Sequence, residues 1–156
     1  SIAKSLGMII HYHNRSKLSE DKENGATYHK DLKSLMSVAD VLSVCCPATK
    51  ETTNLINKKT LEYLPTGAVV TNVARGDIVD DNALIDALNT RKVYAVGLDV
   101  YQGEPNLNPG YLKHKSAFIL PHLGSASKQT RTAMGNLAID NIDEFLRTGS
   151  CKNKVN

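Results

Sequence analysis

Five short runs of apolar and β-branched residues recur along the chain at nearly regular intervals. They begin at residues 8, 41, 68, 95 and 118, so that successive starts lie 33, 27, 27 and 23 residues apart. This spacing is close to the roughly 30 residues of a strand, a helix and a following parallel strand. Because the runs are almost wholly apolar instead of alternating, they are typical of parallel strands that helices cover on both faces. The predicted strands are residues 8–10, 41–44, 68–71, 95–98 and 118–120.

Helical patterns lie between these runs. Residues 31–39 and 81–90 carry apolar residues at helical spacing, and each segment begins with an aspartate that complements the helix dipole. A short helix over 57–64 is followed by a proline, and the longest helix is expected over 127–146. The alternation of strands and helices predicts a doubly wound, parallel α/β sheet of the Rossmann-like type. Such sheets bind ligands at the carboxyl ends of their strands.

Composition excludes several classes of protein. The 156 residues suffice for one domain, and no apolar run approaches the roughly 18 residues of a membrane span. The 19 basic and 16 acidic residues are spread along the chain, so no charged arm predicts a nucleic-acid partner. Three cysteines, without C-x-x-C spacing or a Cys/His cluster, predict neither a disulfide framework nor a metal site. We therefore expect a cytoplasmic protein in a reducing compartment.

One expected feature of a nucleotide-binding sheet is missing from the sequence. A complete dinucleotide-binding domain opens with a strand and a glycine-rich turn, and no G-x-G-x-x-G occurs in this chain. Residues 1–6 read like the second half of the helix that such a turn begins. The expected fold is accordingly an incomplete nucleotide-binding domain that lacks its first strand and its glycine-rich turn.

Reactive side chains follow three of the predicted strands. Arg75 follows the third run, Asp99 and Glu104 follow the fourth, and His122 follows the fifth. Taken singly, an arginine, a loop glutamate or a histidine is more often a surface or structural residue than a functional one. Because successive parallel strands deliver their carboxyl ends to one edge of the sheet, we expect these side chains to converge there.

The same residues lie within three motifs, and a fourth precedes them. The motifs are CPATKETTNLIN (46–57), NVARGDIVDDNALIDAL (72–88), VGLDVYQGEP (96–105) and LPHLGSAS (120–127). With these motifs the chain resembles the carboxyl-terminal half of the D-isomer-specific 2-hydroxyacid dehydrogenases, and its turn after the first run is similar to that of glyoxylate and hydroxypyruvate reductases. The resemblance implies a protein of about twice this length. It implies a partial NAD(P)-binding domain over 1–126, and a helix and tail over 127–156 that pack toward a substrate domain.

The resemblance implies a catalytic role for each strand-end residue. Arg75 would hold the substrate carboxylate and polarise the keto group, because its planar fork suits a bidentate contact. His122 would be the general acid that protonates the carbonyl oxygen, with Glu104 orienting the imidazole and favouring its charged form. Asp99 would fix the nicotinamide amide. The structural alternative is that Asp99 is a helix-start or turn residue and that Gly76 and Gly124 form tight turns with positive φ.

The turn after the first run bears on the choice of nucleotide. A carboxylate there would accept from the ribose 2′-hydroxyl and repel a 2′-phosphate, but Asn14, Arg15 and Ser16 occupy the place. Arg15 can pair with a phosphate and Ser16 can donate to it, which favours NADP(H), with NAD(H) also possible. The alternative is an exposed basic turn. Further cofactor contacts implied by the resemblance are Cys46, Pro47, Thr52, Val73, Ala74 and Gly124.

The adjacent Cys45 and Cys46 have two readings. The first is a pair of small apolar residues that end a strand, with Cys46 on the adenosine side of the cofactor cleft. The second is a redox-sensitive vicinal pair, and the sequence leaves that alternative open.

These expectations define a function and its alternatives. The resemblance implies an oxidoreductase that transfers a hydride from NADPH to a small 2-keto acid, such as glyoxylate or hydroxypyruvate, and forms the D-2-hydroxy acid. The alternatives are a D-lactate or phosphoglycerate dehydrogenase and, in another class, a nucleotide-sensing corepressor or scaffold. A homodimer is the expected partner state of the intact protein. The 156 residues alone are expected to bind nucleotide weakly and to show no measurable turnover.

Overall fold

The computed structural model describes residues 2–155 and divides the chain into two compact units. The first unit extends to Pro121 and the second begins at His122. All the described strands lie in the first unit, whereas the second contains one long helix and the carboxyl-terminal tail.

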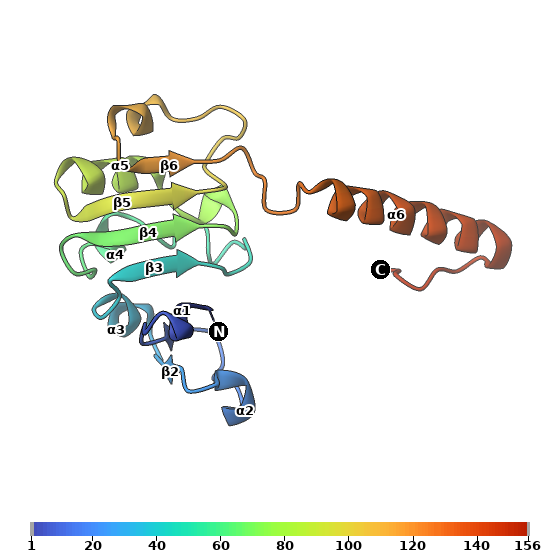
Figure 1. The fold of residues 1–156 in the computed structure, drawn as a ribbon, viewed down its shortest axis with the longest axis horizontal. Helices are drawn as coiled ribbons and strands as arrows, with labels where there is room; N and C mark the ends of the chain where they lie inside the picture. Colours follow the sequence, from blue (N-terminus) through green and yellow to red (C-terminus); the bar gives the residue numbers. More distant parts are fainter. Residues whose placement is uncertain (1, 156) are drawn as a thin grey trace. The chain divides into compact units, whose positions relative to one another are not determined.

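The first unit is built on a parallel sheet of four strands. Its strands are β3 (Val41–Val44), β4 (Ala68–Asn72), β5 (Val93–Leu98) and β6 (Ala117–Ile119), and they lie side by side in chain order (Figure 1). Every neighbouring pair in this sheet is parallel, as the nearly regular spacing of apolar runs predicts. The expected parallel α/β fold is therefore confirmed.

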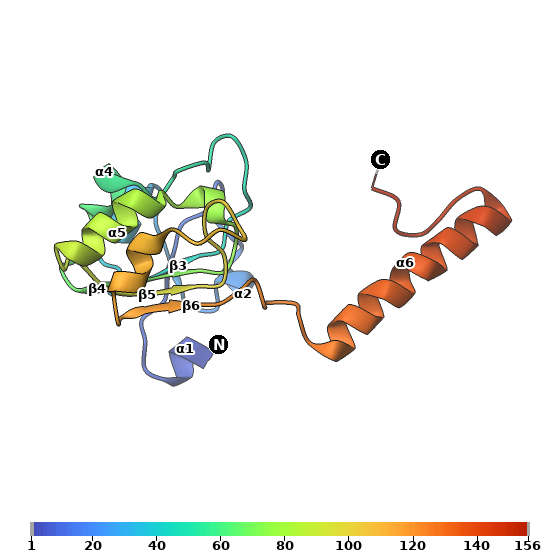
Figure 2. The ribbon, with the colours of Figure 1, turned by 90° about the horizontal axis from the view of Figure 1, so that it is seen from above.

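Within residues 2–155, the helices that pack on the core cover one face of this sheet, whereas the sequence predicted helices on both faces. The observed helices are α3 (Leu32–Met36), α4 (Lys58–Leu61) and α5 (Asp81–Asn89), together with the 3-10 helix η2 (Pro109–Lys113). Figure 2 shows α4 and α5 together on one side of the sheet. Each helix starts at a side-chain cap, since Asp31, Asn57, Asp80 and Asn108 each accept a hydrogen bond from a backbone amide of the turn that follows.

The core lies between these helices and the sheet. Each covering helix buries at least one side chain there, and the sheet supplies the opposite wall. Residues at most 2% exposed include Met36 of α3, Leu61 of α4, Leu84 of α5, Tyr111 of η2 and Val70 of β4. Burial of these apolar side chains is the main force that holds the helices on the sheet.

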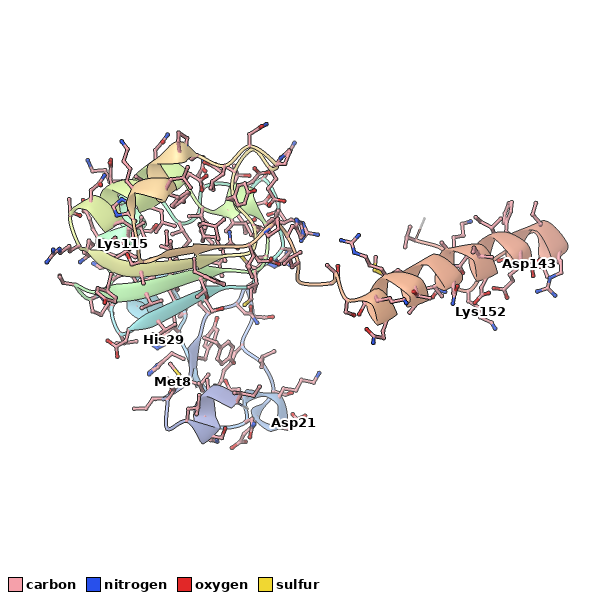
Figure 3. All side chains as sticks on the ribbon, turned by 45° about the horizontal axis from the view of Figure 1, so that its top comes forward. Met8, Asp21, His29, Lys115, Asp143 and Lys152 are labelled. Carbon is pink, nitrogen blue, oxygen red and sulfur yellow. The ribbon has the colours of Figure 1, made fainter. Side chains whose placement is uncertain are left out.

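A second, smaller sheet is formed near the amino terminus. It pairs β1 (His11–Tyr12) with β2 (Thr27–Tyr28) in parallel, and the short helices α1 (Ile2–Ser5) and α2 (Glu20–Glu23) accompany it. The Tyr12 hydroxyl donates to Glu23 of α2 at 2.6 Å. Met8, Asp21 and His29 all lie in this part of the first unit (Figure 3).

The first strand lies at a different position from the one that the sequence predicts. The predicted strand at 8–10 is replaced by β1, and Ile9 is 82% exposed. The physical reason is the position of the partner strand: backbone amides of Thr27 and His29 donate to Ile10 and Tyr12, so pairing with β2 begins only at the end of the apolar run. The β2 strand was not predicted, because its two residues carry no recognisable alternation.

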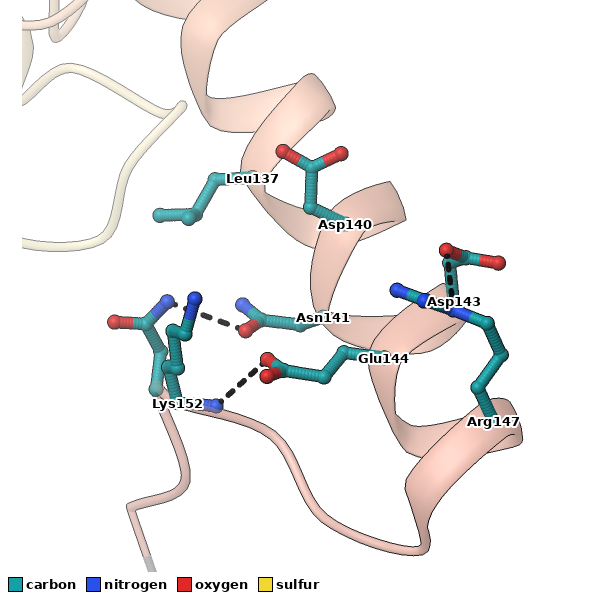
Figure 4. A pocket seen from close by; sticks show the side chains of 8 residues that line it. Leu137, Asp140, Asn141, Asp143, Glu144, Arg147 and Lys152 are labelled. Carbon is teal, nitrogen blue, oxygen red and sulfur yellow. Dashed lines mark hydrogen bonds and ion pairs between the residues drawn. The ribbon is translucent and has the colours of Figure 1, made fainter.

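The second unit consists mainly of α6 (Lys128–Thr148), which starts at the Ser127 cap and ends at Gly149 with a φ of 75°. The tail folds back along this helix, where the Lys152 amide donates to Glu144 at 3.1 Å. A hollow lies between the helix and the tail and is lined mostly by charged and amide side chains (Figure 4). None of the sequence-predicted site residues lines it. Exposed apolar residues of α6 include Met134, Leu137, Ile139, Ile142 and Phe145.

Two further features are absent from residues 2–155. None of their helices combines the length with the apolar character that crossing a bilayer demands. Within the same range, no group of three or more His, Cys, Asp or Glu side chains is arranged as a metal-ligand set.

Candidate active site

The carboxyl ends of the four main strands are aligned along one edge of the sheet. In the register of the strands, Val44 lies opposite Asn72, Asn72 opposite Leu98, and Leu98 opposite Ile119. The segments that follow these strands therefore leave the sheet at the same level. This alignment is the edge at which doubly wound sheets bind ligands.

Asn72 shapes the segment that carries Arg75. Its side chain is 1% exposed, donates through Nδ2 to the carbonyl of Arg75 at 2.8 Å, and accepts at Oδ1 from the Ala74 amide at 3.0 Å. Both polar ends of the buried amide are thus satisfied within one tight turn. The turn leaves Val73 exposed and Ala74 half-buried, and it projects Arg75 onto the surface, where Nη1 donates to the Ala74 carbonyl at 2.6 Å.

Gly76 brings this turn against the loop that follows β5. A Cβ atom added at Gly76 would overlap the backbone carbonyl group of Tyr101 and approach the Gln102 amide nitrogen at 2.8 Å. Gly76 has no positive φ, so a tight turn with positive φ does not explain this glycine. At Gly76 the requirement is close backbone approach, which only a residue without a side chain permits.

The loop after β5 carries the two predicted acidic residues. Asp99 is 8% exposed, and its backbone amide donates to the Asn72 carbonyl at 3.0 Å, which extends the pairing of β4 with β5. Glu104 is exposed, and its Oε1 accepts from the Tyr101 amide at 3.1 Å. Since Gly76 packs on Tyr101, the segments that carry Arg75 and Glu104 are in contact.

The third predicted catalytic residue starts the second unit. His122 follows β6 by three residues, and the Leu120 amide still donates to the Leu98 carbonyl of β5 at 2.8 Å. His122 is exposed and has a left-handed φ of 56°. Gly124 is also exposed and lies in the same segment of the second unit.

The loop after β3 holds three of the predicted cofactor contacts. Cys46 is half-buried, and burial raises the pKa of its thiol. The Thr52 hydroxyl donates to the Pro47 carbonyl at 2.8 Å and accepts from the Thr49 amide at 2.7 Å. Thr52 thus closes the loop on itself. Cys45 is exposed, with its sulfur 3.4 Å from the Ser43 hydroxyl.

The basic turn after β1 is exposed to solvent. Asn14, Arg15 and Ser16 are exposed, and the Asn14 carbonyl accepts from the Tyr28 hydroxyl at 3.2 Å. The pKa of Glu51 is lowered chiefly by a hydrogen bond with Thr49, and the positive charge of Arg15 adds to this effect. The charge of Arg15 therefore acts on Glu51 in the loop after β3.

Lys17 is engaged elsewhere in the same turn. Its Nζ lies 3.6 Å from Glu23 Oε2. The charge of Lys17 is thus partly compensated by a carboxylate of α2, which leaves Arg15 as the better candidate for an anionic ligand.

Sequence reasoning assigned no role to Asn72 or Gln102. One signal for Asn72 was present, because it is a polar residue at the end of an otherwise apolar run. Gln102 gave no comparable signal, because its importance depends on contacts with segments 21 and 48 residues away.

Comparisons with known proteins identify the family of this chain. Residues 1–124 match the family model described as D-isomer specific 2-hydroxyacid dehydrogenase, NAD binding domain. The chain is 41% identical over 143 residues to a glycerate dehydrogenase of Hyphomicrobium methylovorum, with 90% of this chain and 44% of the relative covered. It is 36% identical over 154 residues to a glyoxylate reductase of Thermococcus litoralis, with coverages of 99% and 46%.

A solved structure gives the same result. The NADPH-dependent glyoxylate/hydroxypyruvate reductase of Sinorhizobium meliloti, in complex with NADP and malonate, is 35% identical and superimposes with a TM-score of 0.89. The match covers 97% of this chain and 46% of that one. The chain thus spans about half the length of the relatives it matches. Because the family model covers residues 1–124, the chain belongs to the D-isomer specific 2-hydroxyacid dehydrogenase family, and the match lies in the NAD-binding domain of that family.

Proposed function

We propose that the intact protein is an oxidoreductase that reduces a small 2-keto acid, such as glyoxylate or hydroxypyruvate, to the D-2-hydroxy acid with NADPH. The observation that carries this proposal is the contact of Gly76 with Tyr101, which joins the segments bearing Arg75 and Glu104 at the carboxyl edge of the sheet. Relatives named as reductases and dehydrogenases support an enzyme over a corepressor or scaffold.

Three side chains would perform the protein's part of the reaction. Arg75 presents a planar, permanently charged fork that would hold the substrate carboxylate and polarise the keto oxygen. His122 would donate the proton that this oxygen gains as it becomes a hydroxyl, and Glu104 would orient the imidazole and favour its charged form. Glu104 is a suitable partner because it lies on the exposed side of its loop.

The residues at this edge fit two portions of a nicotinamide nucleotide. Asp99 offers a nearly buried carboxylate at the end of β5 that would accept from the carboxamide of the cofactor. Val73, Ala74 and Gly124 would line the nicotinamide side, while Cys46, Pro47 and Thr52 would line the adenosine side. When bound, the nicotinamide supplies the hydride.

The basic turn after β1 supports NADPH over NADH. Arg15 and Ser16 are exposed and would contact the 2′-phosphate, with Asn14 shaping the turn. The charge of Arg15 contributes to lowering the pKa of Glu51 in the loop after β3, which supports a positive charge on the proposed adenosine side of the edge.

The assembly of the intact protein is a further part of the proposal. The exposed apolar residues of α6, with Phe145 at 56%, fit a helix that packs on another domain, and we assign residues 127–156 to that role. A homodimer is the proposed partner state. Light scattering of the intact protein would test it, and a mass of one chain would contradict it.

The function is tested with the intact protein, a panel of keto acids and both nucleotides. We expect oxidation of NADPH with glyoxylate or hydroxypyruvate, formation of the D-hydroxy acid, and slower reaction with NADH. A strong preference for pyruvate or phosphohydroxypyruvate would support the other dehydrogenases instead. Absence of turnover with every keto acid and both nucleotides would overturn the enzyme assignment.

A further inference from the structure

The loop that carries Glu104 is anchored at several points on the first turn of α5. The Asp81 amide donates to Gln102 Oε1 at 3.1 Å, and the Tyr111 hydroxyl donates to Asp81 Oδ1 at 2.9 Å. Asn108 Nδ2 also donates to Asn82 Oδ1 at 3.1 Å. Glu104 lies between these anchors, two residues after Gln102.

Gln102 also reaches a third segment. Its Nε2 donates to Asn54 Oδ1 at 3.0 Å. The backbone amide of Asn54 in turn donates to the Asp77 carbonyl at 2.8 Å, two residues after Arg75. One half-buried side chain therefore joins the loop after β5, the first turn of α5 and the loop after β3.

We infer that Gln102 is a positioning residue of the proposed reductase site, whose side-chain amide fixes the Glu104 loop between Asn54 and the amino end of α5. This inference rests on the proposed function. Gln102 would not touch the substrate. It would act through Glu104, which is proposed to orient the general acid for proton transfer.

The chemistry of the amide explains why glutamine suits this place. The group offers an acceptor and donors in one plane, and here the acceptor meets a backbone N–H while a donor meets a side-chain oxygen. Methionine has a similar length but supplies no comparable hydrogen bonds. Because small displacements of catalytic groups reduce turnover strongly, loss of this clamp should lower the rate without weakening nucleotide binding.

The first test measures the clamp itself, independently of activity. In Gln102→Met, amide hydrogen exchange should rise about tenfold at Asp81, whose N–H loses its acceptor, and at Tyr101, whose N–H donates to Glu104. The matched control is Gln129→Met, which makes the same chemical change at the chain's other glutamine, in α6. Unchanged exchange at both amides in Gln102→Met would overturn the inference, whatever the activity.

The second test measures the consequence for the reaction in the intact protein. We expect Gln102→Met to lower kcat for the keto acid by roughly tenfold, and to displace the pH dependence of kcat, while the Kd for NADPH changes less than about twofold. An unchanged kcat and pH profile, together with faster exchange, would show a purely structural contact and overturn the positioning role.

Variants of Asn54 distinguish loss of the Gln102–Asn54 hydrogen bond from general destabilisation of the fold. Asn54 has a φ of 49°, so Asn54→Gly removes its side chain without backbone strain, and Asn54→Asp retains the acceptor oxygen. We expect Asn54→Gly to reproduce part of the Gln102→Met effect and Asn54→Asp to remain close to wild type. The double variant Gln102→Met with Asn54→Gly should be no worse than Gln102→Met alone. Fully additive losses would contradict a shared bond.

The two proposals fail in different ways. If the wild-type protein reduces no keto acid with either nucleotide, the proposed function is wrong, and the exchange data still decide whether Gln102 holds the loop. If the wild-type protein is active but Gln102→Met matches it in rate and pH profile, only the positioning role is wrong.

Discussion

The Tyr111 hydroxyl donates a hydrogen bond to Asp81 Oδ1 at 2.9 Å, inside the core where Tyr111 is 1% exposed and Asp81 is 3% exposed. This bond ties η2 to the first residue of α5. The second carboxylate oxygen, Asp81 Oδ2, is buried without a hydrogen-bond partner among residues 2–155. Burial therefore disfavours the charged form and raises the pKa of Asp81 above its ordinary value of 3.8.

This pKa predicts a specific dependence of stability on pH. A carboxyl group whose pKa is higher in the folded state binds more protons when folded, so its contribution is greatest below pH 3.8 and is lost as pH rises through the folded pKa. Asp81→Asn removes this dependence. The difference in unfolding free energy between wild type and Asp81→Asn, measured by urea denaturation across pH 3.5–7, should shift in favour of the variant as pH rises. A difference that is constant with pH would contradict the prediction.

Removing the donor should also destabilise the protein. Tyr111→Phe keeps the buried ring but leaves Asp81 Oδ1 without the hydroxyl, at a cost of about 1–3 kcal/mol in the free energy of unfolding. The control is Tyr94→Phe. Tyr94 is 68% exposed, so water can replace the contacts that its hydroxyl loses. Equal stabilities of the two variants would show that the buried bond contributes little.

Gly76 and Gly97 form a natural pair for testing backbone approach. In Gly76→Ala the new methyl group would overlap the Tyr101 carbonyl, whereas in Gly97→Ala it would lie 3.5 Å from Thr71 Cγ2, an ordinary contact. We expect Gly76→Ala to cost about 1–3 kcal/mol of stability and to lower kcat, because the Arg75 turn must move away from the Glu104 loop. Gly97→Ala should change stability by less than about 1 kcal/mol. Similar effects of the two substitutions would refute a special role for Gly76.

The choice of nucleotide depends on Arg15 in the proposed site. Arg15→Ala should weaken NADPH binding by roughly tenfold or more through loss of a charge-assisted phosphate contact, and should leave NADH binding nearly unchanged. Lys17→Ala is the matched control, since Lys17 is paired with Glu23 and should matter less. Fluorescence titration of the intact protein with both nucleotides gives these values. Equal losses for the two nucleotides would show that the turn does not read the 2′-phosphate.

The main sheet was predictable from the sequence because its strands are continuous apolar runs, even though Val41 of β3 and Phe118 of β6 are 44% and 66% exposed. Buried parallel strands read as continuous apolar runs, and the predicted strand at 68–71 coincides with all but the last residue of β4. The segment around β1 was less predictable. Its pairing depends on β2, a two-residue strand that has no sequence signature and whose position decides which residues of the run join the ladder.

The residues of the proposed site were also predictable only in part. Arg75 and Glu104 could be singled out because they follow strand ends in recognisable motifs. The residues that hold them could not, because their roles come from distant contacts. Gly76 is required because its backbone lies against the Tyr101 carbonyl. The role of Gln102 comes from its hydrogen bonds with Asp81 and Asn54. None of these pairs forms a local pattern that the sequence alone would show.

The most direct measurement is the rate of NADPH oxidation with glyoxylate or hydroxypyruvate by the intact protein and by its His122→Ala variant. Loss of the general acid should lower kcat by roughly 10²- to 10⁴-fold while NADPH still binds. Turnover by His122→Ala at the wild-type rate would remove His122 from the mechanism and contradict its proposed role as general acid.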